Sequence, residues 1–133
     1  MAANARELAR MRAAVSRLSD RQLGAMVNEY WSVAGVLGHI AFWDARVLAL
    51  ADKLERGVPF SPSDAEPEDV DWINDATRPL IHAIAPRDVA RLALRLAEET
   101  DAAVRVVSLS SWIVPSWRRT HASSRGCGRQ CRD

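Results

Sequence analysis

The most regular hydrophobic pattern in the chain lies between residues 33 and 56. Apolar residues recur there at steps of three and four, which is the period of one face of an α-helix. Ser32 precedes this pattern as a helix cap, and Gly57 follows it as a stop signal. The spacing therefore predicts a long central helix, with an apolar face made of Val33, Val36, Leu37, Ile40, Val47, Leu48, Ala51 and Leu54.

Other parts of the chain carry the same helical period. Residues 4–18 predict a first helix, and a loop over residues 57–67 follows the central helix. Residues 68–84 predict a further helical segment, but Pro79 removes a backbone hydrogen bond at a cost of about 3 kcal/mol, so we expect a kink or two short helices. A second long helix should begin at Pro86, with a buried stripe of Val89, Leu92, Leu96, Thr100, Ala103 and Val107.

These segments predict one all-α domain over residues 1–114, an up-and-down bundle of the four-helix type. The stretch 115–133 has five arginines and no apolar periodicity, which is typical of disorder. We therefore expect the last bundle helix to be missing or disordered. Cys127 and Cys131 both fall in this stretch, so no disulfide is expected to crosslink the core.

Charge and composition indicate which kinds of partner and which cellular location to expect. A formal net charge of +1 argues against steering toward nucleic acid or acidic lipid. The longest uncharged run, residues 30–43, is shorter than the 18 or so apolar residues that a membrane span requires. Residues 1–15 show no apolar stretch of the signal-peptide kind. We therefore expect a cytoplasmic protein with no membrane and no specific nucleic-acid partner.

The chemistry-bearing residue of the central helix is His39, which follows Trp31 by eight residues and precedes Trp43 by four. A neutral imidazole in such apolar surroundings is either a core histidine hydrogen-bonded across the bundle or a metal ligand. Spacing alone leaves both alternatives open, because one helix does not supply the further ligands that a metal needs. His82 is expected to be a polar residue near a helix end.

The residues around His39 also carry a family resemblance. The motif formed by Trp31-Ser32-Val33, His39 and Trp43-Asp44 resembles the signature of the DinB/YfiT-like helical-bundle superfamily. It is most similar to the branch that includes the mycothiol-dependent maleylpyruvate isomerase N-terminal domain. The resemblance implies that His39 is the first of three metal ligands, the others being a His-x-x-x-His pair on the last helix. This chain lacks that pair, since His121 is followed four residues later by Arg125. His39 and His121 are therefore the predicted metal ligands.

Two classes of function follow. The resemblance implies a divalent metal (Zn or Ni), mycothiol as a cosubstrate, and a thiol S-transferase or isomerase activity toward a small-molecule thiol or electrophile. The alternative is a non-catalytic helical-bundle module for binding or dimerisation, with a degenerate metal site. Whether the chain is an enzyme stays open at this point. In either class, a bundle without its fourth helix exposes an apolar surface, so we expect a homodimer that covers it or, failing that, a poorly soluble monomer.

Overall fold

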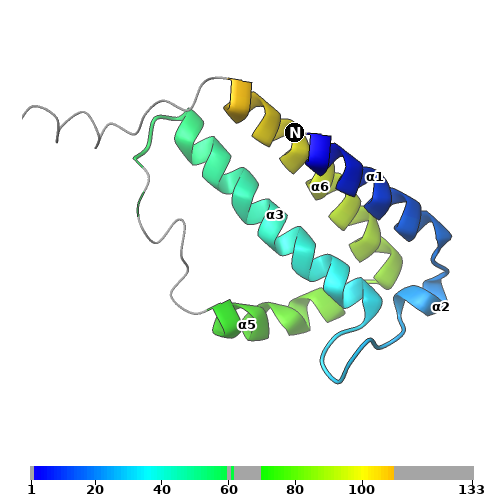
Figure 1. The fold of residues 1–133 in the computed structure, drawn as a ribbon. Coiled ribbons are helices and arrows are strands. Elements are labelled where there is room, and N and C mark those ends of the chain that lie inside the picture. The colour runs from blue at the N-terminus through cyan, green and yellow to red at the C-terminus, as the bar shows by residue number, and fades with distance from the viewer. Residues whose placement is uncertain (1, 60, 62–69, 110–133) are drawn as a thin grey trace, which may run out of the picture.

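The computed structural model describes residues 2–59, 61 and 70–109. Within these residues the fold is helical, as predicted, and contains α1 (Ala2–Arg17), α2 (Asp20–Leu23), α3 (Val33–Glu55), α5 (Val70–His82) and α6 (Pro86–Leu109). Figure 1 shows α6 lying between α1 and α3, while α5 crosses beside the beginning of α3. α1 runs opposite to α3 and α6, which share one direction because the chain returns through α5. The predicted tail and the domain boundary at residue 114 lie outside the described residues.

The predicted start and stop signals of the helices are confirmed. The Ser32 hydroxyl accepts a hydrogen bond from the backbone N–H of Gly35 at 2.9 Å, so it caps the first turn of α3. Ser19 and Gln22 form a reciprocal capping box at the start of α2. Beyond the other end of α3, Gly57 has a φ of +73°, a conformation that favours glycine.

α5 is one continuous helix although it contains Pro79. Of the two forms predicted for this segment, the pair of short helices is therefore wrong. Pro79 lies three residues before the last residue of α5, so the hydrogen bond that it removes belongs to the final turn. The preceding turns keep their backbone bonds, and the Thr77 hydroxyl additionally donates to the carbonyl of Ile73 at 3.0 Å.

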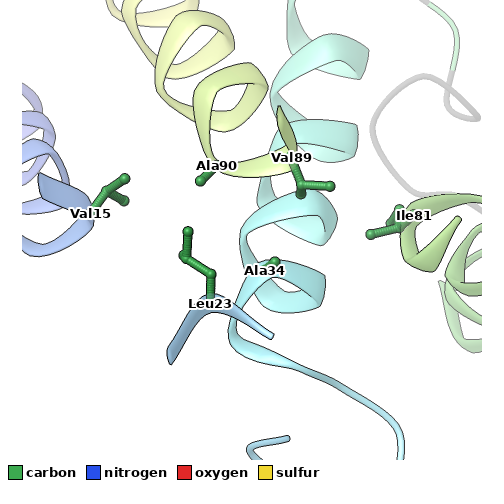
Figure 2. Packing of buried hydrophobic residues seen from close by; sticks show 6 residues of the cluster. All are labelled: Val15, Leu23, Ala34, Ile81, Val89 and Ala90. Carbon is green, nitrogen blue, oxygen red and sulfur yellow. The ribbon is translucent and has the colours of Figure 1, made fainter. Parts of the chain in front are cut away.

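All five described helices meet in a core at one end of the bundle. Leu23 of α2 and Ala90 of α6 are fully buried there. Figure 2 shows this cluster, to which every helix contributes at least one side chain: Val15, Leu23, Ala34, Ile81, Val89 and Ala90. Because α5 and the short α2 both contribute, the core fixes the N-terminal end of α3 more firmly than its C-terminal end.

The buried face of α3 differs from the predicted one. We expected its large apolar residues to pack inward, but the buried residues of α3 are Ala34, Gly35, Gly38 and Ala41. Several residues of the predicted stripe are exposed instead, namely Val36, Ile40, Val47 and Leu54. The reason is the closeness of the neighbouring helices. A β-carbon built on Gly38 would contact Ile81 of α5 and would lie 2.9 Å from Val89 Cγ1 of α6, so only a small residue fits.

Among the described residues, α3 alone is long and apolar enough to cross a membrane by length and composition. The same test is met by core helices of soluble proteins. α3 packs against both α5 and α6, and it carries Asp44 and Arg46 near its middle. The prediction that no membrane is involved therefore stays a prediction.

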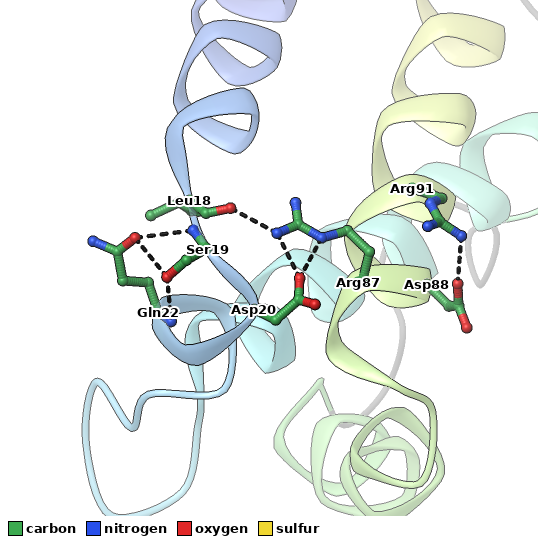
Figure 3. Close-up of polar contacts among 7 residues, drawn as sticks. All are labelled: Leu18, Ser19, Asp20, Gln22, Arg87, Asp88 and Arg91. Atoms are coloured by element: carbon green, nitrogen blue, oxygen red, sulfur yellow. Dashed lines mark hydrogen bonds and ion pairs between the residues drawn. The ribbon is translucent and has the colours of Figure 1, made fainter.

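Arg87, at the start of α6, joins this helix to the turn between α1 and α2. Its guanidinium donates to the carbonyl of Leu18 at 2.7 Å and pairs with Asp20 at 2.6 Å (Figure 3). The neighbouring Arg91 only reaches Asp88 on its own helix. Arg87 therefore links segments that are distant in the sequence, whereas Arg91 does not.

We expect Gly38→Ala to destabilise the fold. Alanine gains about 1 kcal/mol of helix propensity over glycine, but overpacking against Ile81 and Val89 costs about 1–3 kcal/mol. The free energy of unfolding, measured by urea denaturation, should fall by about 1 kcal/mol. Gly24→Ala is the control, because a β-carbon there meets only ordinary contacts at 3.6 Å or more. A Gly38→Ala protein more stable than the wild type would contradict the close packing.

Arg87→Ala should lower the free energy of unfolding by about 1 kcal/mol, since it removes a charge-assisted bond to a part-buried carbonyl. Arg91→Ala removes only an exposed ion pair within one helix and should cost no more than about 0.5 kcal/mol. Chemical denaturation of both variants measures the difference. Equal losses would show that the link across the turn adds no stability.

Candidate functional site

His39 lies in the second turn of α3, partly buried between two indole rings. Its ring centroid is 5.5 Å from that of Trp31 and 6.2 Å from that of Trp43, both in edge-to-face orientation. Trp43 belongs to the same helix, one turn further on, whereas Trp31 comes from the loop that leads into it. The arrangement holds the imidazole in one orientation, because aromatic side chains are stiff and pack favourably edge to face.

The Nδ1 atom of His39 is buried and has no hydrogen-bond partner among the described residues. A buried polar atom without a partner costs about 1–3 kcal/mol, so such atoms are rare and call for an explanation. A core histidine would form a hydrogen bond across the bundle. The Nδ1 atom of His39 forms no such bond with any described residue. An unpaired imidazole nitrogen is also what a metal ligand presents before the metal binds.

His82, the last residue of α5, approaches the same tryptophan from another helix. Its ring centroid lies 5.7 Å from that of Trp31. Its Nε2 atom lies 2.7 Å from the place that a β-carbon on Gly35 would occupy, so a side chain at position 35 would push the His82 ring aside. With Ser32, Met26 and Pro86, His82 also borders a cleft of about 200 Å³ at the N-terminal end of α3. The expectation that His82 is a polar residue at a helix end is confirmed. Its side chain also contacts Trp31 and lies next to Gly35.

Arg78 of α5 completes the surroundings of Trp31, and the sequence analysis did not identify it. Its guanidinium carbon lies 5.5 Å from the ring centroid of Trp31 and 4.9 Å from that of Tyr30, as in a cation–π contact. Arg78 also pairs with Asp75. Its Nε atom and the Oδ1 atom of Asn74, one helical turn earlier, are buried without hydrogen-bond partners among the described residues.

We call Trp31 and the residues in ring contact with it the Trp31 cluster; these residues are His39, Arg78 and His82. The cluster brings together one residue of the loop, one of α3 and two of α5. Only the spacing of Trp31 and His39 was visible in the sequence. A feature that could have indicated the rest is the four-residue step from Asn74 through Arg78 to His82, which places all three on one face of a helix.

Among the described residues, His39 is suited to bind a metal ion, but the further ligands that a metal site needs are not found there. No group of three or more histidine, cysteine, aspartate or glutamate side chains within residues 2–59, 61 and 70–109 could hold a metal ion. His121, the second predicted ligand, lies outside the described residues, as do Cys127 and Cys131. His39 is thus the one predicted ligand whose surroundings can be described, and its unpaired Nδ1 is consistent with that role.

Asp44 follows the aromatic segment of α3 and is partly buried. Burial disfavours its charged form and raises the pKa of this carboxyl above its ordinary value. The Thr100 hydroxyl of α6 donates to the backbone carbonyl of Asp44 rather than to its carboxylate. Arg12 of α1 pairs with Glu98 of α6.

The structure therefore defines an all-helical bundle with a partly buried histidine set between tryptophans on its long central helix. A sequence model of the DinB superfamily matches residues 3–119, and the chain belongs to this superfamily. The match confirms the family predicted from the motif around His39, and it ends two residues before His121. No curated protein and no solved structure matches the chain.

We expect Asp44→Asn to stabilise the fold at neutral pH more than at acidic pH. Folding raises the pKa of Asp44, so the folded state binds the carboxyl proton more tightly than the unfolded state does. The free energy of unfolding therefore falls as the pH rises above 3.8, the ordinary pKa of this carboxyl. Asparagine does not ionise, so the variant does not lose stability in this way. Thermal unfolding of the wild type and the variant at about pH 3.5 and about pH 7 tests this. A difference in melting temperature that does not grow with pH would contradict it.

Proposed function

We propose that the protein binds a divalent metal ion, Zn or Ni, with His39 as a ligand. The observation that carries the proposal is the buried Nδ1 atom of His39, which has no partner among the described residues, while the imidazole lies between two indole rings. Imidazole suits both metals. In this proposal His121 is a second ligand, and the remaining positions are filled by further protein groups or by a bound small molecule.

The activity that we propose for this site is a thiol S-transferase or isomerase reaction of the kind found in the mycothiol-dependent branch of the family. A metal of this type, when bound, lowers the pKa of a coordinated thiol and makes it a better nucleophile. The chain's own residues would serve this in two ways. Trp31 and Trp43 hold the imidazole in place and exclude water from it, and the Arg78 guanidinium supplies positive charge beside Trp31. Mycothiol as cosubstrate and a small electrophile as its acceptor belong to the same proposal, as does a cytoplasmic location.

A second function is favoured by a different observation. No group of three possible metal ligands is found among the described residues, while α3 exposes large apolar residues. Both features fit a non-catalytic DinB-type module that binds through its helical surface, in which the metal site is degenerate. The two functions differ in one measurable property, which is the retention of metal by His39.

Metal retention tests the first proposal directly. The full chain is incubated with excess Zn²⁺ or Ni²⁺, desalted, and assayed for metal by mass spectrometry. We expect about one ion per chain in the wild type and a loss of most of it in His39→Ala, since a site with one fewer imidazole binds far more weakly. His121→Ala should also lose metal.

His82→Ala is the matched control, because it removes a second imidazole that contacts Trp31 but is not a proposed ligand. It should retain the ion, and circular dichroism should show the same helix content in every variant. Metal-free wild-type protein, or equal retention by His39→Ala, would remove the metal proposal and leave the module. If metal is retained, transfer of a low-molecular-weight thiol to a model electrophile then tests the reaction class.

A further inference from the structure

α1 and α6 leave an open cleft between them, with a volume of about 230 Å³. Figure 1 shows the beginning of α1 beside the second half of α6, where this cleft lies. The lining residues of each helix follow one another at steps of three and four, so they share one face of that helix. None of them belongs to the Trp31 cluster or to the core cluster. Binding in this cleft would therefore not depend on a metal at His39.

The cleft is lined by two carboxylates and two guanidinium groups. Arg12 of α1 pairs with Glu98 of α6 at 2.8 Å. Arg105 of α6 pairs with Asp101, one turn earlier on the same helix, at 2.6 Å. The formal charges of these four side chains sum to zero, so the lining as a whole attracts neither a simple cation nor a simple anion. A molecule that carries both signs can face an opposite charge at each end, which is the complementarity that gives specificity.

Asp101 is the buried member of this set. Its side chain is only 11% exposed, whereas that of its partner Arg105 is 50% exposed. The Oδ2 atom of Asp101 accepts from Arg105, but its Oδ1 atom is buried and has no hydrogen-bond partner among the described residues. A buried acceptor without a donor is rare in folded proteins. The terminal torsion of aspartate is broad, so the carboxylate can turn an oxygen toward a donor in the cleft. A charged N–H group would be the strongest such donor.

Arg105 offers the complementary group. A guanidinium carries five N–H donors in a planar fork that suits carboxylates. Arg105 uses its Nη2 atom for Asp101, and no bond from its Nε or Nη1 atom to a described residue is found. One turn of α6 therefore presents, side by side, an acceptor for an ammonium group and donors for a carboxylate. These two groups occur together, at that short separation, in a free α-amino acid.

We propose that this cleft binds a free α-amino acid with an apolar side chain. Its ammonium group donates to Asp101, and its carboxylate accepts from Arg105. Its side chain lies against the apolar part of the lining, which consists of Ala5, Leu8 and Ala102. The size agrees with this, because a cavity of about 150 Å³ holds benzene with its six heavy atoms. In the same proportion, 230 Å³ accommodates about nine heavy atoms, the number in leucine.

A chemical-shift titration of the ¹⁵N-labelled full chain with L-leucine tests the ligand class. We expect saturable shifts at amides of α1 and α6, with a Kd of about 1 mM or below for a ligand of this size. Two analogues keep the side chain and lack one charge: 3-methylbutylamine has no carboxylate, and 4-methylpentanoate has no ammonium group. Each should bind at least about tenfold more weakly, because one charged group of the cleft loses its partner. An analogue that binds as tightly as leucine would overturn the proposal in favour of a simple cation or anion site.

Two variants test the place of binding. Asp101→Asn keeps the shape of the side chain and removes its charge, so the affinity for leucine should fall at least about tenfold. Ala102→Leu fills the cleft from an exposed position and should abolish the shifts even if Asp101→Asn fails to fold. Asp52→Asn is the matched control, because Asp52 also pairs with an arginine four residues later but does not line the cleft. It should bind leucine like the wild type.

Two results would overturn the proposal. One is the absence of saturable shifts in the wild type up to about 20 mM leucine, well above the expected Kd. The other is an unchanged affinity in a folded Asp101→Asn or Ala102→Leu protein, which would place the binding elsewhere on the molecule.

Discussion

The close approach of α3 to α5 and α6 is the constraint on which the other features depend. It exists because Gly38 presents no side chain where Ile81 and Val89 lie, and because the neighbouring inward residues, such as Ala34 and Ala41, are also small. A helix that packs through its small residues must carry its large apolar residues elsewhere. The exposure of large apolar residues on the rest of α3 therefore follows from the tight interface made by its small residues.

The same constraint assembles the Trp31 cluster. Bringing α5 near the start of α3 places the His82 imidazole over Gly35 and the Arg78 guanidinium over Trp31. His39 itself contacts only Trp43 of its own helix and Trp31 of the preceding loop among the ring contacts of the described residues, and α5 reaches it through Trp31. The price is that polar atoms of His39, Asn74 and Arg78 are buried unpaired in the described part of the chain. A bound group that hydrogen-bonded to one of these atoms would remove an unfavourable term of about 1–3 kcal/mol.

The helices and their ends were predictable because their signals are local. Ser32 and Gly57 act on the turn in which they lie, and Pro86 begins α6 through its fixed backbone angle. The inward face of α3 was not predictable from periodicity, since both faces of this helix are apolar and large residues dominate a hydrophobic pattern. Only the contact of Gly38 with Ile81 and Val89 decides between the faces, and that contact joins residues more than forty positions apart.

For the site, the sequence motif located His39, and its family was then confirmed. The contact of Arg78 with Trp31 depends on how α5 crosses the start of α3, and the sequence of neither segment alone determines that crossing. This crossing gives Trp31 a further property. Its indole is in contact with a residue of α3 and two residues of α5 at once, so a small sliding of one helix along the other changes its electronic surroundings. The fluorescence of the Trp31 indole therefore depends on the distance between the two helices.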